Sequence, residues 1–499
     1  MSIDAVGGVR VVGTVEPALP EPRAQANMLV VVANRLPAEY DDEAGWVRSP
    51  GGLVTALESV LEGRQSVWVG WSGRFSDAPD EADPAGGAMP DRMGDCELVD
   101  VKQSVADGKL YYDGFCNSTL WPLYHDTVVP PAYHRRQFEA YRRVNQRFAD
   151  HVAELAGHGA TVWVHDYQLQ LVPAMLRKLR PDVTIAYFLH IPFPPIELFQ
   201  QLPWRQQVLD GLLGADLVGF QTEGGARNFL ALCERLLGYD VEGETVVLSA
   251  DQGGRRVRAG GFPISIDATA MDALAATPAV QERARELREE LGAPELLLLG
   301  IDRLDYTKGI DIRMKAFVEL FEDGLLEAGS AVMVQVATPS REMIEEYQRI
   351  RNDVELIAGR AMGAVGTVGV SPIHYLHKHL PREELVALYV AADIMLVTPL
   401  RDGMNLVAKE YVASRRDGGG ALVLSEFAGA AHEMTEAFQV NPHDADGLKR
   451  VIMAAVNSPA DERRRRMAAL RKNVFENDAA HWVDSFMSAL AVARSDRDA

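Results

Sequence analysis

The sequence predicts an α/β protein built from doubly wound parallel sheets. Apolar runs alternate along the chain with amphipathic stretches, and each run is continuously hydrophobic instead of alternating with polar residues. Continuous hydrophobicity is typical of strands buried on both faces, as in parallel sheets that helices cover on both sides. In such folds ligands bind at the carboxyl ends of the strands, so the polar residues that follow each run are the candidates for function.

The expected strands and helices follow in chain order. The strands of the first half begin at Met28, Thr161, Thr184 and Asp216. Those of the second half begin at Glu295, Ala331, Asp393 and Ala421. The helices with the clearest amphipathic pattern are expected at Tyr133–Leu155, Glu282–Leu291 and Met404–Arg416.

The chain divides into two series of strands and helices. The segment Gly260–Asp267 contains glycines and a proline between the two series, so we expect a hinge there and a domain boundary at 262/263. Residues 1–26 lack periodicity and are expected to form a loose arm, and the acidic stretch Asp77–Asp91 a solvated surface loop. Two domains of similar size leave a cleft between them, and such a cleft can hold two substrates.

Charge and composition exclude several classes of protein. The chain has 499 residues with 71 acidic and 50 basic side chains, a formal charge of −21. This balance disfavours nucleic acids and anionic membranes as partners, so any bound phosphate needs a local cluster of cations. No GxxxxGK[ST] or GxGxxG loop is present, and the three cysteines lack metal-ligand spacing. Without a secretory signal or a membrane-spanning run, we expect a cytoplasmic protein.

The first candidate cluster is NRLP (Asn34–Pro37) with the glycine pair Gly51 and Gly52. Arg35 follows the first expected strand and can hold a phosphate through two hydrogen bonds. A glycine pair that opens a helix lets backbone amides approach an anion closely. The alternative is a polar turn followed by an ordinary helix start.

The second cluster is IDRLDYTKGID (Ile301–Asp311), after the most hydrophobic strand of the second half. It places Arg303 and Lys308 on one loop ahead of a helix, which suits a diphosphate that must leave as an anion. Either residue could instead be an ordinary loop charge.

The third cluster is TPLRDGMNLVAKEYV (Thr398–Val412). Backbone amides of the expected first helical turn are free to bind a phosphate or a sugar hydroxyl, and Glu410 is placed to accept from ribose hydroxyls. The simpler reading makes Asp402 a helix cap and Glu410 a surface residue. Asp166 and His190 each follow a strand, and the aromatic segment Tyr111–His125 could stack on a sugar or belong to the core.

These motifs together resemble the trehalose-6-phosphate synthase family. The resemblance runs from about Met28 to near the C-terminus, with the motifs in the family's order. It is carried by NRLP, GGL, GWSG, NSTLWP, VHDYQL, FLHIPFP, RLDYTKG, TPSR, RDGMNLVAKEY and LSEFAGAA. It implies a GT-B fold, two Rossmann-like domains facing a cleft, and a retaining, metal-independent transfer of glucose from a nucleotide sugar to glucose 6-phosphate. It also implies that residues 478–499 form a helix crossing back to the N-terminal domain.

The resemblance assigns a role to each candidate residue. The acceptor phosphate would be held by Arg35, Tyr112 and Arg341, and the acceptor sugar would face Trp121 and Asp166. The donor would contact Gly51, Gly52, Arg303, Lys308, Asp402, the segment Met404, Asn405, Leu406 and Val407, Glu410 and Leu380. His190 would touch the transferred glucose, while Trp71, Trp121 and Ile191 would line the site. The catalytic candidates are Asp166, His190, Arg303, Lys308 and Asp402.

Two alternatives stay open at the level of sequence. A related transferase could use another phosphorylated acceptor, such as glycerol 3-phosphate or a cyclitol phosphate, or the chain could be a silent sugar-phosphate sensor. Retention of Arg303, Lys308 and Asp402 disfavours the sensor, which has no leaving group to stabilise. The nucleobase of the donor cannot be read from the sequence. The resemblance also implies a homo-oligomer, either a dimer or a tetramer. No phosphatase motif follows the synthase region.

Overall fold

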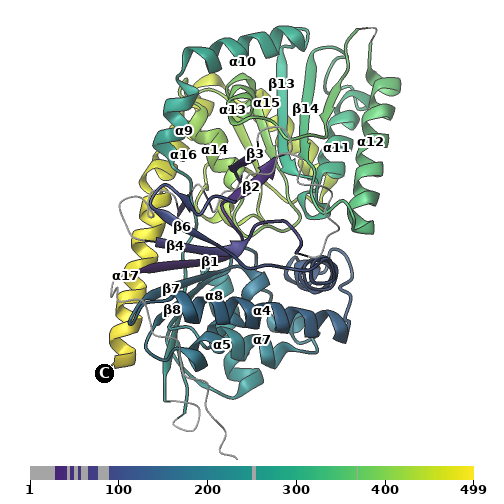
Figure 1. The fold of residues 1–499 in the computed structure, drawn as a ribbon. Coiled ribbons are helices and arrows are strands. Elements are labelled where there is room, and N and C mark those ends of the chain that lie inside the picture. Colours follow the sequence, from purple (N-terminus) through teal and green to yellow (C-terminus); the bar gives the residue numbers. More distant parts are fainter. Residues whose placement is uncertain are drawn as a thin grey trace, which may run out of the picture.

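The computed structural model describes residues 28–41, 45–49, 54, 56–57, 66–76, 89–249, 254–367 and 369–498. Two α/β domains stack one above the other in Figure 1, and the C-terminal helix α17 runs along the side of the lower one. Gly51, Gly52, the arm 1–26 and most of the acidic loop lie outside the described residues.

The N-terminal domain is built on a sheet that has ten strands in the described part of the chain, in the order β10-β11-β12-β9-β8-β7-β1-β4-β6-β5. The strands from β12 to β6 are parallel. At one edge β11 pairs antiparallel with both β12 and β10, and at the other edge β5 pairs antiparallel with β6. Their bounds are β1 Leu29–Arg35, β4 Ser66–Trp71, β5 Arg92–Met93, β6 Cys96–Asp100, β7 Thr161–His165, β8 Thr184–Phe188, β9 Leu217–Phe220, β10 Asp240–Glu242, β11 Thr245–Val247 and β12 Arg256–Gly261.

The C-terminal domain is built on a parallel sheet, six-stranded in the described residues, in the order β15-β14-β13-β16-β17-β18. The strands are β13 Leu296–Arg303, β14 Ala331–Thr338, β15 Ile373–Leu376, β16 Ile394–Val397, β17 Ala421–Ser425 and β18 Phe438–Val440. A separate hairpin, β2 (Ala38–Asp41) with β3 (Gly45–Arg48), is formed by the acidic stretch after NRLP.

Both sheets reverse their strand order at one place, and these places carry the candidate residues. The reversal lies between β1 and β7 in the first sheet and between β13 and β16 in the second. At such a switch point the connections leave in opposite directions, so a crevice opens at the carboxyl ends of the two strands. Arg35 ends β1 and Arg303 ends β13. This architecture confirms the predicted fold class of two Rossmann-like domains.

Helices cover both faces of the sheets (Figure 1). In the N-terminal domain they are α2 Val105–Asp107, η1 Gly108–Leu120, α3 Trp121–Tyr124, α4 Arg135–Leu155, η2 Tyr167–Leu169, α5 Val172–Leu179, α6 Ile196–Phe199, α7 Arg205–Leu212, α8 Glu223–Leu232 and η3 Cys233–Leu237. The rest are α9 Ala268–Ala275, α10 Pro278–Glu290, η5 Tyr306–Lys308, α11 Ile310–Glu322, α12 Glu345–Val365, α13 Arg382–Ala391, α14 Leu406–Ser414, η6 Gly429–His432, α15 Ala445–Asn457, α16 Ala460–Glu476 and α17 Ala479–Asp498. None of the described helices is long and apolar enough to pass through a bilayer.

Helix α17 returns the chain to the N-terminal sheet. Phe486 is fully buried and stacks on Trp163 of β7 with ring centroids 4.7 Å apart. Trp482 of the same helix lies 5.3 Å from the Trp163 ring. Near its end, Arg497 pairs with the buried carboxylate of Asp216 at 3.3 Å. The last helix therefore contributes to the core of the domain in which the chain begins.

Candidate active site

Lys308 and Asp402 form a nearly buried ion pair at the switch point of the C-terminal sheet. The Lys308 ammonium lies 2.5 Å from Asp402 Oδ2, with side chains only 9% and 14% exposed. Asn405 Nδ2 donates to the same carboxylate oxygen at 3.1 Å. Burial raises the pKa of Asp402, but the Lys308 charge outweighs it and holds that pKa below its ordinary value. The Asp402 carboxylate therefore stays ionised at neutral pH.

Arg341 lies at the centre of a second cluster that joins the two domains. Its guanidinium lies 3.9 Å above the Trp121 ring and donates to the Tyr167 hydroxyl at 3.1 Å, both from the N-terminal domain. On its own domain it pairs with Asp305 at 3.2 Å and contacts the Tyr347 hydroxyl. Burial opposes ionisation of Asp305, yet the charges of Arg341, Lys308 and Arg303 bring its pKa to about 2.

The two clusters belong to one charged region. Both Lys308 and Arg341 act on the Asp305 carboxylate, and the exposed Arg303 lies 5.6 Å from the Trp121 ring. The interaction of Arg341 with Tyr112 adds that residue to the group. The structure thus brings together Tyr112, Trp121, Arg303, Lys308, Arg341 and Asp402.

Asp166 and His190 meet behind this region, after β7 and β8. Asp166 has a φ of 74°, a left-handed conformation that is uncommon outside glycine, and its Oδ1 accepts from the His190 amide at 3.2 Å. Burial raises the pKa of Asp166 to about 6, although Arg303 and Arg341 act against this. Burial also lowers the pKa of His190 to about 3, so its ring is neutral and hydrogen-bonds His165 at 3.1 Å.

Arg35 and Trp71 form a separate pair at the ends of β1 and β4. The Arg35 guanidinium lies 4.9 Å from the Trp71 ring and is exposed to solvent. Gly73 allows this arrangement, because its φ is 92° and a Cβ there would lie 2.5 Å from Arg35 Nη2. In the described part of the chain no hydrogen bond or ion pair joins this pair to Arg341.

The residue that caps the start of α14 is Asn405 and not Asp402. Asn405, with φ 85°, is the N-cap and accepts from the Ala408 amide at 3.3 Å, whereas Asp402 is engaged with Lys308. Leu406 and Val407 begin the helix and are partly exposed, while Met404 is buried. The simpler interpretation of Asp402 as a helix cap is therefore wrong.

Glu410 and Leu380 belong to the same C-terminal domain. Glu410 accepts a hydrogen bond from the Tyr389 hydroxyl at 2.8 Å, and burial raises the pKa of its carboxyl. It is not the surface residue of the simpler interpretation, since it is only partly exposed. Leu380 is partly buried against the core before α13.

His125 belongs to the site but was not identified from the sequence. It is 1% exposed, its ring lies 4.1 Å from that of Trp121, and Nδ1 faces the Trp121 carbonyl oxygen at 2.8 Å. Burial lowers the pKa of His125 to about 4 against the influence of Asp305, so the ring is neutral. Its Nε2 has no hydrogen-bond partner among the described residues. The only signal in the sequence was its place in the aromatic segment Tyr111–His125.

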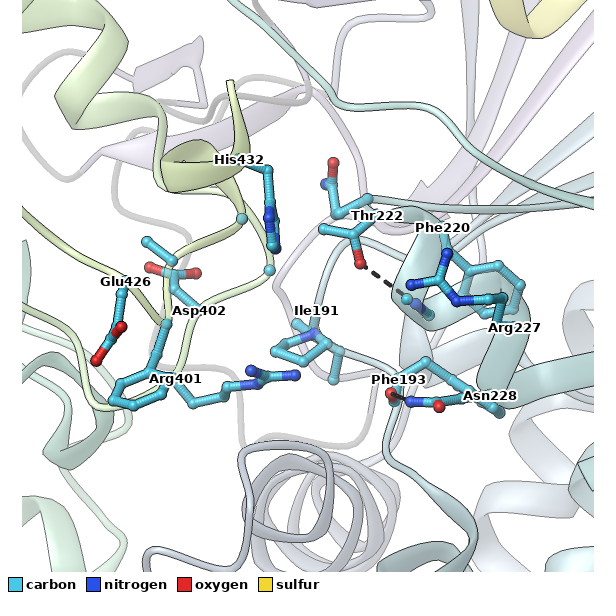
Figure 2. A pocket seen from close by; sticks show the side chains of 18 residues that line it. Ile191, Phe193, Phe220, Thr222, Arg227, Asn228, Arg401, Asp402, Glu426 and His432 are labelled. Carbon is cyan, nitrogen blue, oxygen red and sulfur yellow. Dashed lines mark hydrogen bonds between the residues drawn. The ribbon is translucent and has the colours of Figure 1, made fainter. Parts of the chain in front are cut away.

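A cavity of about 190 Å³ lies between the domains beside these residues (Figure 2). Ile191 and Phe193 line it from the N-terminal domain, and Arg401, Asp402 and His432 from the C-terminal domain. Ile191 is thus part of the boundary between the domains. In the described part of the chain, no three His, Cys, Asp or Glu side chains are grouped to hold a metal ion.

Comparison with known proteins assigns the chain to a family. The sequence model of glycosyltransferase family 20 matches residues 25–492. The chain belongs to glycosyltransferase family 20. Trehalose-6-phosphate synthases of Mycolicibacterium paratuberculosis and Mycobacterium tuberculosis are each 55% identical to this family 20 chain, over 471 and 475 residues. The alignments cover 93% of the chain and 95% and 94% of those proteins. The family 20 chain is accordingly a glycosyltransferase of trehalose biosynthesis, which confirms the predicted enzyme class.

Solved structures agree with the family 20 assignment. A UDP-forming α,α-trehalose-phosphate synthase from Burkholderia vietnamiensis superposes with a TM-score of 0.85 at 34% identity, covering 94% of this chain and 99% of that one. An E. coli structure bound with UDP-2-fluoro glucose has a TM-score of 0.82 at 34% identity, covering 93% and 98%. A Burkholderia xenovorans synthase in complex with glucose 6-phosphate has a TM-score of 0.83 at 33% identity, covering 93% and 99%.

Proposed function

We propose that this chain transfers glucose from a nucleotide-activated glucose to glucose 6-phosphate and retains the α configuration. The products are α,α-trehalose 6-phosphate and a nucleoside diphosphate. The observation that carries the proposal is the charged region formed by Lys308–Asp402 and by Arg341 with Trp121 across the domain gap. The ligands of the Burkholderia xenovorans and E. coli neighbours, glucose 6-phosphate and UDP-2-fluoro glucose, support the two substrates.

Each substrate is assigned one part of the charged region. Arg303 and Lys308 receive the diphosphate, together with the amides that begin α14. Arg341, Tyr112 and, on closure of the gap, Arg35 receive the phosphate of glucose 6-phosphate. Glu410 accepts from the ribose, and Leu380 lies toward the nucleobase.

The proposed step breaks the bond between the anomeric carbon and the diphosphate oxygen, which leaves with the electron pair. The hydroxyl on C1 of glucose 6-phosphate attacks the same face, and its proton passes to the departing phosphate oxygen. Preorganised cations stabilise the charge that develops on the leaving group, and the proposal needs no metal ion.

The positions of the carboxylates support this route over a covalent intermediate. A double displacement needs a free carboxylate nucleophile and a second carboxyl group nearby. Asp402 is bound by Lys308 and Asn405, and Asp305 by Arg341 and Tyr347. Both carboxylates are therefore engaged by cationic, amide or hydroxyl donors.

The experiment is a product assay with a panel of donors and acceptors. Purified protein is incubated with UDP-, ADP- or GDP-glucose and with glucose 6-phosphate, glycerol 3-phosphate or a cyclitol phosphate, and the products are identified by NMR. We expect a non-reducing disaccharide phosphate with two α-anomeric protons, formed with glucose 6-phosphate alone. Turnover with another acceptor, a β linkage, or binding without turnover would each contradict the proposal.

A further inference from the structure

The loop Thr398–Asn405, which carries Asp402 and is named here the Asp402 loop, contacts the N-terminal domain in two places. At Gly403 the backbones of the domains touch, since a Cβ on this residue would lie 2.3 Å from the His190 carbonyl oxygen. The second contact is made by Arg401, the residue before Asp402, whose Nε lies 3.3 Å from Asp126 Oδ2. Figure 2 shows the Arg401 side chain extending from the loop toward Ile191 of the other domain.

Asp126 lies in a turn with an unusual backbone. Both Asp126 and Thr127 have a φ of 55°, and the left-handed region is a genuine outlier for a β-branched residue such as threonine. Such a conformation persists only where the surroundings fix it. Here the Thr127 amide donates to the Pro122 carbonyl at 2.9 Å, and the preceding His125 is buried against Trp121. The turn therefore presents Asp126 from the same rigid segment that carries Trp121.

The Arg401–Asp126 ion pair contributes little to the stability of the fold. The Arg401 and Asp126 side chains are 32% and 42% exposed, so solvent screens their attraction. What the pair does is connect two catalytic elements: the turn after Trp121 on one domain and the residue next to Asp402 on the other. A shift of Arg401 along the loop would move Asp402 relative to Lys308.

We propose that Arg401 and Asp126 are positioning residues, which hold the Asp402 loop against the N-terminal domain so that the Lys308–Asp402 pair faces Trp121 and Arg341. The inference rests on the proposed transfer reaction. Their effect on the rate comes through the placement of Asp402, because small misplacements of catalytic groups are costly.

The test is a double-mutant cycle of Arg401→Gln and Asp126→Asn in the full chain. Asparagine tolerates the left-handed conformation at least as well as aspartate, so the second change removes charge and preserves the turn. Each single variant is expected to lower kcat by about tenfold. The double variant should be no slower than the slower single variant, and each KM should change by less than about twofold.

Three further measurements separate positioning from a structural role. Arg401→Lys, which keeps the charge, should recover most of the lost kcat. The melting temperature of all variants should stay within about 2 °C of the wild type, because an exposed pair contributes little stability. The coupling energy between Arg401 and Asp126 from the double-mutant cycle should fall as the sodium chloride concentration is raised, since salt screens exposed charges. Glu139→Gln, which removes the exposed Glu139–Arg142 pair, is the matched control and should leave kcat unchanged.

The outcomes distinguish this inference from the proposed function. If wild-type protein shows no transfer, the proposed function fails. If the wild type turns over but Asp126→Asn is as fast as the wild type, or the two changes act additively, the positioning role is wrong. A loss of kcat that follows a loss of melting temperature would likewise overturn it.

Discussion

At the scale of single residues, the charges of the site are fixed by their neighbours. Lys308 and Arg341 keep Asp402 and Asp305 ionised although both carboxylates are buried. Asp166 has no direct ion pair among the described residues, and burial raises its pKa to about 6. Three carboxylates in one region therefore differ in proton affinity because of different partners.

Lys308→Ala tests the leaving-group role. Removing the ammonium should lower kcat by about 10²- to 10³-fold, because its attraction for the departing diphosphate grows in the transition state. The fold should persist in circular dichroism. Lys315→Ala, which removes an exposed partner of Asp311 one helix turn away, should leave kcat unchanged. Near-normal turnover of Lys308→Ala would refute the role.

Asp166→Asn tests the raised pKa through stability. Between about pH 4 and pH 6 the carboxyl is ionised in the unfolded chain but protonated in the folded one, so the wild type loses stability as pH rises. The asparagine variant does not titrate there. Its free energy of unfolding relative to wild type should rise by roughly 1–3 kcal/mol over this window and level off above it. Urea titrations at several pH values measure the difference in free energy of unfolding between the variant and the wild type. A difference that does not change with pH would contradict the raised pKa of Asp166.

At the scale of elements, α17 is an anchor for the N-terminal sheet. Phe486 is fully buried on Trp163, so Phe486→Ala should lower the free energy of unfolding by about 3–5 kcal/mol. Val492 on the same helix is 47% exposed, and Val492→Ala should change it by less than about 0.5 kcal/mol. Chemical denaturation measures the free energy of unfolding of both variants. Equal losses would show that the packing of Phe486 does not hold the helix.

The strands expected from apolar runs were predicted correctly, including the four-residue strands β9 and β16, whereas other described strands were not identified. β1, β13 and β14 lie where their hydrophobic runs indicate. β4 (SVWVGW), which pairs directly with β1, was not identified, because a run that mixes aromatic and glycine residues has no decisive period. The helix expected at Met404–Arg416 spans Leu406–Ser414, since the left-handed Asn405 caps it.

At the scale of the whole molecule, a largely parallel sheet and a parallel sheet meet at their switch points, and this follows from the alternation of strands and helices. Residues at strand ends, such as Arg303, Lys308 and Asp402, could be named from the sequence because parallel sheets place strand ends at one edge. His125, Asp305 and Tyr347 could not, since their part in the site depends on contacts between segments distant in sequence. Asp305 and Tyr347 contact each other and Arg341 within the C-terminal domain, and His125 of the N-terminal domain interacts with Asp305. The pairing of Arg401 with Asp126 has the same origin, because distant loops meet only in the folded chain.

The central claim is that the cations between the domains hold a sugar phosphate and a nucleoside diphosphate side by side. The most direct measurement is a crystal structure of the protein soaked with UDP and glucose 6-phosphate. We predict the diphosphate within hydrogen-bonding distance of Arg303 and Lys308, and the sugar phosphate on Arg341 with Tyr112 and Arg35. A diphosphate bound away from Lys308, or a sugar phosphate outside the gap, would contradict the account.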